Sequence, residues 1–298
     1  MSNAEPRFGR LITAMVTPFN DERELDLDRA QALATRLIEG GNDSLIINGT
    51  TGESPTVFYP QKIELFRAVV EAVGGKAPVI ANVGDNCTAD TVNFAKDVAK
   101  LGVDGFMCVV PYYNKPPQEG MYQHFKTIAD AVELPIILYN IPGRCVVNME
   151  AETTLRLAND CENVIAVKEA SGKMDQIATI AAAAPEGFSV YSGDDSATYD
   201  IMRLGGAGVI STTGNVAPER MKELVTKCAE GKWDEAWAAH EALLPLMNGL
   251  FETSNPILVK EALKLVGFPV GGVRLPLIDA TAEQSARLAS IMREVGVL

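Results

Sequence analysis

The sequence predicts an α/β protein, a (β/α)8 TIM barrel with a C-terminal helical extension. Short apolar runs rich in β-branched residues recur eight times, and helical patterns separate them. The interval from one run to the next is about 18 to 34 residues, the size of one β-α unit. The runs are nearly continuous in apolar residues, which is typical of parallel strands covered on both faces.

Eight strands are expected in order along the chain, at residues 11–17, 44–49, 78–83, 105–110, 136–141, 164–169, 189–193 and 207–212. Amphipathic patterns predict helices between them at 60–73 and 118–132, and the pairs Gly40-Gly41 and Gly74-Gly75 are placed to end helices. A doubly wound open sheet is the alternative. It calls for a glycine-rich loop after the first strand, where this chain has Thr17-Pro18-Phe19-Asn20.

The last third of the chain has a different pattern. Beyond Val216 no strand is expected, and helical patterns occur at 218–229, 233–250, 255–266 and 281–295. Trp233 and Trp237 lie four residues apart on one helical face, which indicates packing. We therefore expect a catalytic barrel over residues 9–230 and a helical extension over residues 231–298.

The composition excludes several classes of protein. The 298 residues are 47% apolar, and 26 basic against 39 acidic residues give a net charge of −13, which disfavours a nucleic-acid partner. No apolar run reaches the ~20 residues of a membrane span, and no secretory signal is recognisable, so we expect a cytoplasmic protein without a membrane partner. Five cysteines without a CxxC pair and only two histidines argue against a disulfide framework and a metal site. Ser2-Asn3-Ala4 resembles an expression scar.

Lys168 is the most informative single residue. It follows Val164-Ile165-Ala166-Val167 at the end of the sixth predicted strand, and barrel active sites lie at the carboxyl ends of strands. Burial disfavours the ammonium form and lowers the pKa of the amine, which makes a lysine a nucleophile toward carbonyl groups. The alternative is a structural lysine paired with a carboxylate, either Glu169 or Glu53.

Other predicted strand ends carry polar groups suited to the same site. The turn Gly49-Thr50-Thr51-Gly52 offers hydroxyls and backbone N–H groups that can hold a carboxylate, although an ordinary helix-capping turn is the alternative. Tyr139 can transfer protons, and the alternative is an aromatic side chain that only packs in the core. Arg144 can bind a carboxylate with two hydrogen bonds, and the alternative is a solvated surface arginine.

Together these motifs resemble one family. The resemblance runs from about Gly9 to Gly267 and is carried by Gly49-Thr50-Thr51-Gly52-Glu53-Ser54, Pro111-Tyr112-Tyr113-Asn114, Tyr139-Asn140-Ile141-Pro142-Gly143-Arg144, Val167-Lys168-Glu169-Ala170, Ser192-Gly193-Asp194-Asp195 and Asn255-Pro256-Ile257-Leu258-Val259-Lys260. The pattern is similar to that of the 4-hydroxy-tetrahydrodipicolinate synthase (dihydrodipicolinate synthase) family, among the pyruvate-dependent class I aldolases that include N-acetylneuraminate lyase. Cys145 departs from it, since the family usually has threonine there.

The resemblance implies a lyase of lysine and diaminopimelate biosynthesis that condenses pyruvate with L-aspartate 4-semialdehyde. It implies that Lys168 forms a Schiff base with pyruvate and that no cofactor is needed. It implies a proton relay of Tyr139, Thr50 and a Tyr113 that reaches in from a neighbouring subunit. The positions that match substrate-binding residues of the family are Thr51, Arg144, Ile210 and Gly193.

The resemblance also has implications for assembly and regulation. It implies a homotetramer built as a dimer of dimers, with Tyr112 and Tyr113 at the tight interface. Members inhibited by lysine bind it at positions that correspond here to Ser54, Pro55, Tyr59, Lys62, Asn86, Asp90 and Tyr112. Sensitive relatives generally have histidines where this chain has Tyr59 and Lys62, and glutamate in place of Asp90. Lys62 would bring an ammonium close to the ammonium of the ligand, so weak or absent inhibition is expected.

Two other functions stay open at this point. A sister aldolase would cleave N-acetylneuraminate or a 2-keto-3-deoxy sugar acid, and such members tend to lack an arginine at the Arg144 position. A non-catalytic barrel would bind a keto acid without forming a covalent bond to Lys168. Reduction with borohydride in the presence of pyruvate separates the second alternative from an enzyme.

Overall fold

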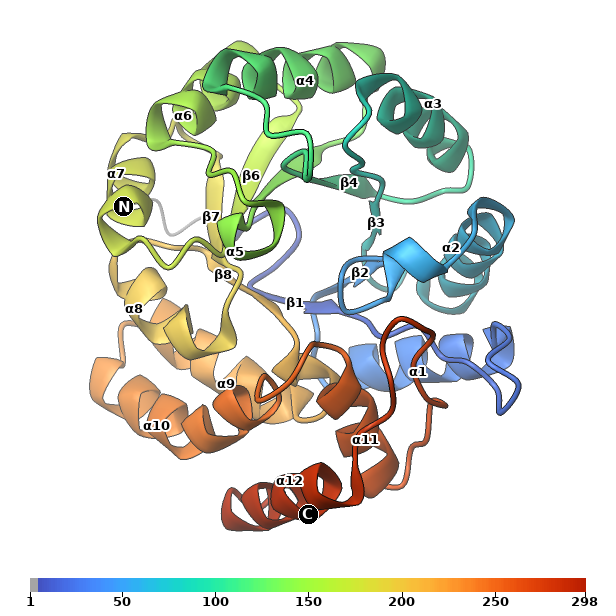
Figure 1. Cartoon of the computed structure of the whole chain (residues 1–298). Helices are drawn as coiled ribbons and strands as arrows, with labels where there is room; N and C mark the ends of the chain where they lie inside the picture. The colour runs from blue at the N-terminus through green and yellow to red at the C-terminus, as the bar shows by residue number, and fades with distance from the viewer. Residues whose placement is uncertain (1–4) are drawn as a thin grey trace.

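Eight parallel strands form a closed barrel in which each strand pairs with its neighbour in the chain and β8 pairs with β1 (Figure 1). The computed structural model describes residues 5–298, so Ser2-Asn3-Ala4 lies outside the described residues. The strands are β1 (Leu11–Ala14), β2 (Ser44–Ile47), β3 (Val79–Asn82), β4 (Gly105–Val109), β5 (Ile136–Asn140), β6 (Val164–Glu169), β7 (Ser189–Ser192) and β8 (Gly208–Ser211). The predicted barrel is confirmed, and the open sheet is excluded.

The predicted strands are right in number and order, but most are slightly too long. The largest difference is in β1, which ends at Ala14, where the apolar pattern predicted residue 17. Met15 and Val16 are buried as well, although they belong to the loop that leaves the strand. Apolar residues therefore continue past the last strand residue at the mouth of the barrel, and the pattern alone does not reveal where pairing stops.

Helices surround the barrel and cover the outer faces of the strands (Figure 1). The helices that follow β1 to β8 are α1 (Leu27–Glu39), α2 (Tyr59–Val73), α3 (Thr88–Ala99), α4 (Gln118–Ala131), α6 (Ala151–Asp160), α7 (Met174–Ala183), α8 (Thr198–Arg203) and α9 (Pro218–Ala229). Gly40 and Gly74 end α1 and α2 as predicted. Short helices lie in the loops at the mouth: η1 (Ser54–Thr56), α5 (Pro142–Cys145), η2 (Asp195–Ala197) and η3 (Thr213–Asn215).

Alternation along the strands decides which side chains enter the barrel. Inward-facing residues such as Ile12, Ile46 and Ile210 form an inner cluster, while a separate outer cluster lies between the strands and the helices. On β6, Ala166 belongs to the inner cluster and Val167 to the outer one. The same alternation directs Lys168, two residues after Ala166, toward the barrel interior.

The C-terminal extension consists of α10 (Trp233–Gly249), α11 (Ile257–Leu265) and α12 (Ala282–Glu294), which lie beside α9 and α1 (Figure 1). Its buried apolar residues share one continuous cluster with the outer face of the barrel, so the division at residue 230 stays a prediction. Trp233 and Trp237 pack edge-on against Tyr199, at 6.0 and 5.0 Å between ring centroids, as the packing interpretation predicted. Among the helices of residues 5–298, none is long and apolar enough to cross a membrane.

Candidate active site

A lysine and a tyrosine lie side by side at the mouth of the barrel. Tyr139 on β5 and Lys168 on β6 are register partners at the carboxyl ends of their strands. The Lys168 Nζ lies 4.4 Å from the centroid of the Tyr139 ring. Both residues are buried, with only 6% of Lys168 and 4% of Tyr139 exposed. The adjacent strands therefore bring the two predicted catalytic side chains into direct contact.

Burial changes the acid–base behaviour of Lys168. Loss of solvent lowers the pKa of its amine from 10.5 to about 8, because the apolar surroundings disfavour the charged form. The carboxylate of Asp195 acts in the opposite direction, and the Arg144 guanidinium lowers the pKa further. With this pKa, roughly a tenth of the amine is neutral at pH 7, far more than for a solvated lysine. Lys168 is thus prepared to attack a carbonyl group.

Neither carboxylate considered as a structural partner pairs with Lys168. Glu169 faces the other side of β6, where Asn140 and Gln176 donate hydrogen bonds to its carboxylate at 2.7 and 3.0 Å. Glu53 instead forms an ion pair with Lys260, at 2.6 Å between Nζ and Oε1. Within residues 5–298, Lys168 forms no ion pair. The ion-pair interpretation of this lysine is therefore wrong.

Tyr139 is held in its neutral form. Burial raises the pKa of its phenol to about 12, while Arg144 and the Thr50 hydroxyl act in the opposite direction. A phenol with this pKa stays protonated at neutral pH, so it can donate a hydrogen bond or a proton beside the amine of Lys168. The pair thus combines a nucleophile and a proton donor.

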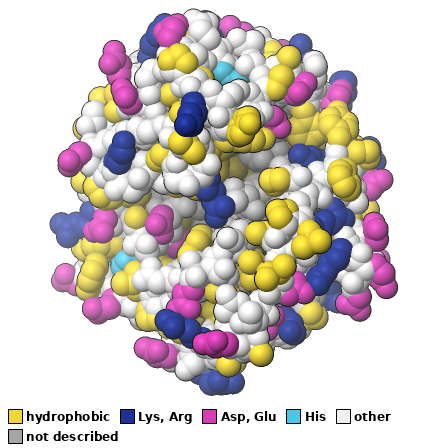
Figure 2. Space-filling view, in the orientation of Figure 1, with side chains coloured by type: hydrophobic (Ala, Val, Ile, Leu, Met, Phe, Trp, Pro, Cys, Tyr) yellow, Lys and Arg dark blue, Asp and Glu magenta, His cyan; other side chains and the backbone are white. Residues whose placement is uncertain are grey.

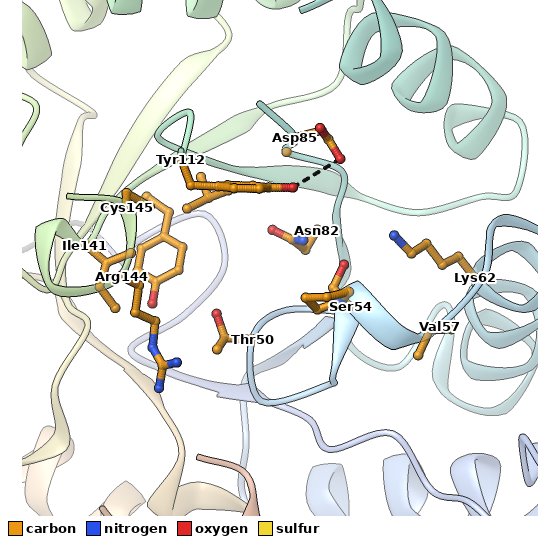
Figure 3. Close-up of a pocket in the computed structure, with 14 residues that line it drawn as sticks. Thr50, Ser54, Val57, Lys62, Asn82, Asp85, Tyr112, Ile141, Arg144 and Cys145 are labelled. Atoms are coloured by element: carbon orange, nitrogen blue, oxygen red, sulfur yellow. Dashed lines mark hydrogen bonds between the residues drawn. The ribbon is translucent and has the colours of Figure 1, made fainter. Parts of the chain in front are cut away.

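A cavity of about 460 Å³ opens in front of Tyr139 (Figure 3). Thr50 reaches it from the turn after β2 and Ser54 from η1. Arg144 comes from α5, and Lys62 comes from α2. A second cavity of about 640 Å³ adjoins Arg144 and is lined by Gly193. From the same side, the molecular surface is hollowed near its centre, with basic side chains at the edge of the hollow (Figure 2). Small anions therefore meet positive charge there, despite the overall negative charge.

The turn between β2 and η1, residues 49–53, offers hydrogen-bond donors next to the cavity. Within residues 5–298, the backbone N–H groups of Thr50 and Thr51 have no protein acceptor. Asn48, just before the turn, and Glu53, its last residue, have left-handed backbone conformations, with φ of 63° and 55°. Such conformations are strained for residues other than glycine and are often found at functional sites. Thr51 is buried and Thr50 lines the cavity, so the turn presents donors toward the site.

Gly193 and Ile210 lie close to Lys168 and leave it room. Gly193 is the residue after β7, and a Cβ there would lie 3.1 Å from the Lys168 Cγ and 2.7 Å from the Ala170 Cβ. A larger residue at 193 would therefore displace the lysine. Ile210 on β8 faces the barrel interior in the same inner cluster as Tyr139. Both positions fit a role in shaping the space around the amine.

Tyr113 is the one predicted catalytic residue that the structure does not bring into the site of its own chain. It is 87% exposed, has a left-handed backbone with φ of 74°, and does not line the cavity in front of Tyr139. The neighbouring Tyr112 does line that cavity, and its hydroxyl donates to Asp85 over 3.3 Å. Tyr113 therefore lies outside the site of its own chain, on the surface of the molecule.

The residues predicted for the lysine pocket gather around a smaller cavity of about 230 Å³, whose lining includes Ser54, Tyr59, Lys62 and Asp90. Burial lowers the pKa of Lys62, and Asp85 acts against that shift. The remaining three positions lie next to this cavity. Pro55 and Tyr112 line the cavity of about 460 Å³ in front of Tyr139, and the Asn86 amide donates to the Tyr112 carbonyl at 3.0 Å.

Sequence reasoning gave no role to three buried polar residues at the site. Asp195 accepts hydrogen bonds from the backbone N–H groups of Thr212 and Thr213 at 3.0 and 2.8 Å, and its charge acts on Lys168. Asn255 and Lys260 contact the turn after β2 from the C-terminal extension. All three occur in the motifs that carry the family resemblance, but only the fold reveals what they contact. Among residues 5–298, no group of His, Cys, Asp or Glu side chains is arranged to hold a metal ion.

This geometry defines a class of protein: a closed (β/α)8 barrel with a buried lysine beside a tyrosine at the carboxyl ends of its strands. The model of the dihydrodipicolinate synthetase family matches residues 7–295. The chain belongs to that family.

Individual relatives agree along the whole chain. The chain is 53% identical to the 4-hydroxy-tetrahydrodipicolinate synthase of Moorella thermoacetica, over 98% of this chain and 100% of that one. A structure of dihydrodipicolinate synthase from Cyanidioschyzon merolae with lysine bound is 45% identical, with a TM-score of 0.97 over 99% of this chain and 100% of that one. A structure of the chloride-inhibited enzyme from Acinetobacter baumannii complexed with pyruvate is 36% identical, with a TM-score of 0.95 over 98% of this chain and 100% of that one.

Proposed function

We propose that this protein is a lyase that condenses pyruvate with L-aspartate 4-semialdehyde to give 4-hydroxy-tetrahydrodipicolinate, a step of lysine biosynthesis. The observation that carries the proposal is the buried, unpaired Lys168, whose pKa of about 8 leaves a reactive amine against the Tyr139 ring. The name shared by the curated relatives supports the choice of substrates. The reaction uses no cofactor, because the lysine itself provides the electron sink.

The first half of the reaction activates pyruvate. The neutral Lys168 amine attacks the ketone carbon, and the resulting carbinolamine loses water to give a protonated imine. This iminium withdraws electrons from the adjacent methyl group, which loses a proton and becomes an enamine carbon. Tyr139 lies beside the nitrogen and is protonated at neutral pH, so it can donate the proton that leaves with water and later accept one.

The second half joins the substrates and frees the enzyme. The enamine carbon attacks the aldehyde carbon of the semialdehyde, and the aldehyde oxygen takes a proton and becomes a hydroxyl group. The amino group of the semialdehyde then attacks the imine carbon, which closes a six-membered ring. Cleavage of the bond to Lys168 restores the amine. Every step moves protons, and Tyr139, Thr50 and the Tyr113 of a neighbouring subunit form the relay in this proposal.

Two carboxylates must be held for this sequence. Thr51 and the free N–H groups of the turn 49–53 suit the carboxylate of pyruvate, since they lie beside the barrel mouth without a formal charge. Arg144 lines both cavities described at the barrel mouth and suits the carboxylate of the semialdehyde. Cys145, which replaces a usual threonine, is buried next to it and lines the same cavity.

We further infer that the protein works in the cytoplasm as a homotetramer, a dimer of dimers. All five cysteines are free, as expected in a reducing compartment. Tyr112 and Tyr113 are exposed next to the site, where a second subunit would cover them.

The test is borohydride reduction with pyruvate, followed by intact mass and peptide mapping. Wild-type protein should gain the mass of reduced pyruvate on Lys168, and Lys168→Ala, which removes the amine without enlarging the side chain, should gain none. Circular dichroism serves as the folding control. Trapping on another lysine, or no trapping in the wild type, would overturn the Schiff-base assignment.

A steady-state assay then identifies the second substrate. Turnover of pyruvate with L-aspartate 4-semialdehyde should far exceed cleavage of N-acetylneuraminate or of a 2-keto-3-deoxy sugar acid. Faster cleavage of either sugar acid would identify the protein as a sister aldolase. Trapped pyruvate would still identify Lys168 as the nucleophile in that case.

A further inference from the structure

The C-terminal extension contacts the turn that carries the two threonines. In Figure 1, α11 lies near α1 at the lower edge of the view, and hydrogen bonds link this extension to the turn. Two separate contacts join the two segments: a hydrogen bond from Asn255 to Thr51, and a buried ion pair between Lys260 and Glu53. The turn thus touches residues more than two hundred positions away in the sequence.

The contact with Thr51 restricts the direction of a hydroxyl group. The Asn255 Nδ2 donates to the Thr51 Oγ1 at 2.9 Å, and both residues are buried. An amide NH2 group can only donate, so the Thr51 oxygen accepts there and its own hydrogen must point elsewhere. The other nearby side-chain oxygen is the Thr212 Oγ1 at 3.5 Å, which is a weak partner. Thr51 is therefore left as a donor for a ligand.

The ion pair prevents the turn from moving away from Asn255. The side chains of Lys260 and Glu53 are 2% and 1% exposed, and their Nζ and Oε1 lie 2.6 Å apart. Lys260 also donates to the Gly272 carbonyl at 2.8 Å, and its ammonium lies 4.2 Å from the Phe19 ring centroid. The second Glu53 oxygen accepts from the Arg274 backbone N–H at 2.9 Å. Both carboxylate oxygens of Glu53, a residue with a strained backbone, are thus occupied by the extension.

We propose that Asn255 is a positioning residue for pyruvate, which acts by turning the Thr51 hydroxyl so that its hydrogen points to the substrate carboxylate. The inference rests on the proposed function, in which the turn 49–53 holds that carboxylate. Within residues 5–298, the hydrogen bond to Thr51 is the only one made by the buried Asn255 side chain, so this side chain acts on the turn through that hydroxyl alone. The extension thereby acts on the first substrate without touching it.

The test compares two variants of Asn255. For each, the measured quantity is the pyruvate concentration that gives half-maximal borohydride trapping on Lys168. Asn255→Ala removes the donor, whereas Asn255→Asp places an acceptor at the same position, captures the Thr51 hydrogen and adds a negative charge near the substrate. Half-maximal trapping should need at least about 10-fold more pyruvate in Asn255→Asp, the scale of a lost hydrogen bond to a charged group, and less of an increase in Asn255→Ala. KM for the semialdehyde should stay within about twofold, since Arg144 binds it.

A double-mutant cycle separates positioning from a general structural role. In a Thr51→Val background the hydroxyl is gone, so Asn255→Ala should cause no further loss of pyruvate affinity. Asn159→Asp makes the same chemical change on the exposed face of α6 and should leave trapping unchanged. Additive effects in the cycle, or equal effects of Asn255→Ala and Asn255→Asp, would overturn the proposal. Failure of the wild type to trap pyruvate would instead overturn the proposed function.

Discussion

At the scale of single residues, burial in the barrel shifts the pKa values of two side chains in opposite directions. Burial moves the pKa of Lys168 down to about 8 and that of Tyr139 up to about 12, because each is held away from its charged form. In solvent an amine is charged at neutral pH and a phenol is a very weak acid. Here a partly neutral amine lies against a protonated phenol, so nucleophile and proton donor are present at the same pH.

The first prediction concerns pH. In the proposed mechanism only the neutral form of Lys168 attacks pyruvate. The rate of imine formation at low pyruvate should therefore rise about tenfold per pH unit below 8 and level off near pH 9. The phenol of Tyr139 stays protonated throughout this range, so the rise belongs to the lysine. Borohydride trapping after short incubations measures the rate. An inflection near 10.5, the usual value for lysine, would contradict the effect of burial.

The second prediction concerns the phenol itself. Tyr139→Phe keeps the ring against the Lys168 amine and removes only the hydroxyl, so burial of the lysine should persist. Turnover should fall by about 10²-fold or more, the usual scale for the loss of a positioned proton donor. Steady-state turnover with both substrates measures the effect, and circular dichroism checks the fold. Near-normal turnover would remove Tyr139 from the proton relay.

Single residues differ in how far the sequence reveals their role. Lys168 was predictable, because four apolar residues before it on one strand dictate its burial. Asp195 and Asn255 were not, because their contacts come from distant parts of the chain, such as the hydrogen bond between Asn255 and Thr51. Burial follows from local pattern, whereas a hydrogen-bond partner depends on where the fold brings remote segments together.

At the scale of elements, the strands and helices were predictable and the loops at the barrel mouth were not. Eight apolar runs and the helices between them follow local periodicity, which is why α9 begins and ends at the predicted residues. The turn 49–53 follows one residue with a left-handed backbone, Asn48, and ends on another, Glu53, and the C-terminal extension holds it, so its conformation depends on tertiary contacts. Function is concentrated in such loops, on a scaffold that local pattern determines.

The third prediction concerns the cavity between α2 and α3. Lys62 lines it together with Tyr59, whose hydroxyl is already engaged with Asp97 at 2.7 Å. A bound lysine would bring its own ammonium near that of Lys62, and like charges ~4 Å apart repel by roughly 1–4 kcal/mol, or about 5- to 1000-fold in affinity. Asp90 is one methylene shorter than the glutamate of sensitive relatives, so its pairing with the ligand would be stretched. Inhibition by L-lysine should therefore be weak or absent.

The condensation assay with increasing L-lysine tests this prediction, and Lys62→His provides a matched variant. Replacing the ammonium of Lys62 by a mostly neutral imidazole should increase the sensitivity to L-lysine by about 5-fold or more at pH 8. Strong inhibition of the wild type at submillimolar L-lysine would mean that the cavity tolerates both ammonium groups. In that case the charge argument for Lys62 would be wrong.

At the scale of the whole molecule, exposed aromatic side chains lie close to the site. Tyr113 is 87% exposed, Phe58 70% and Tyr59 50%, all on loops and helix ends near the barrel mouth. Exposed apolar surface of this kind is typical of an interface, and a twofold axis would apply the same contact to both subunits. In such a dimer, Tyr113 of each subunit would enter the site of the other subunit, as the proposed shared site requires.

The last prediction concerns this sharing of Tyr113 between the sites of two subunits. Sedimentation at assay concentration should show an obligate dimer, and a tetramer is the expected final state. A fully active monomer would contradict the shared site. A sharper test combines two impaired chains, Lys168→Ala and Tyr113→Phe, by co-expression. If sites are shared, each mixed dimer holds one site with an intact Lys168 and an intact Tyr113, and one site that lacks both. Random pairing then restores up to about a quarter of wild-type activity, because half of the dimers are mixed and half of their sites are intact. If each chain used its own Tyr113, every site would stay impaired and mixing would restore nothing.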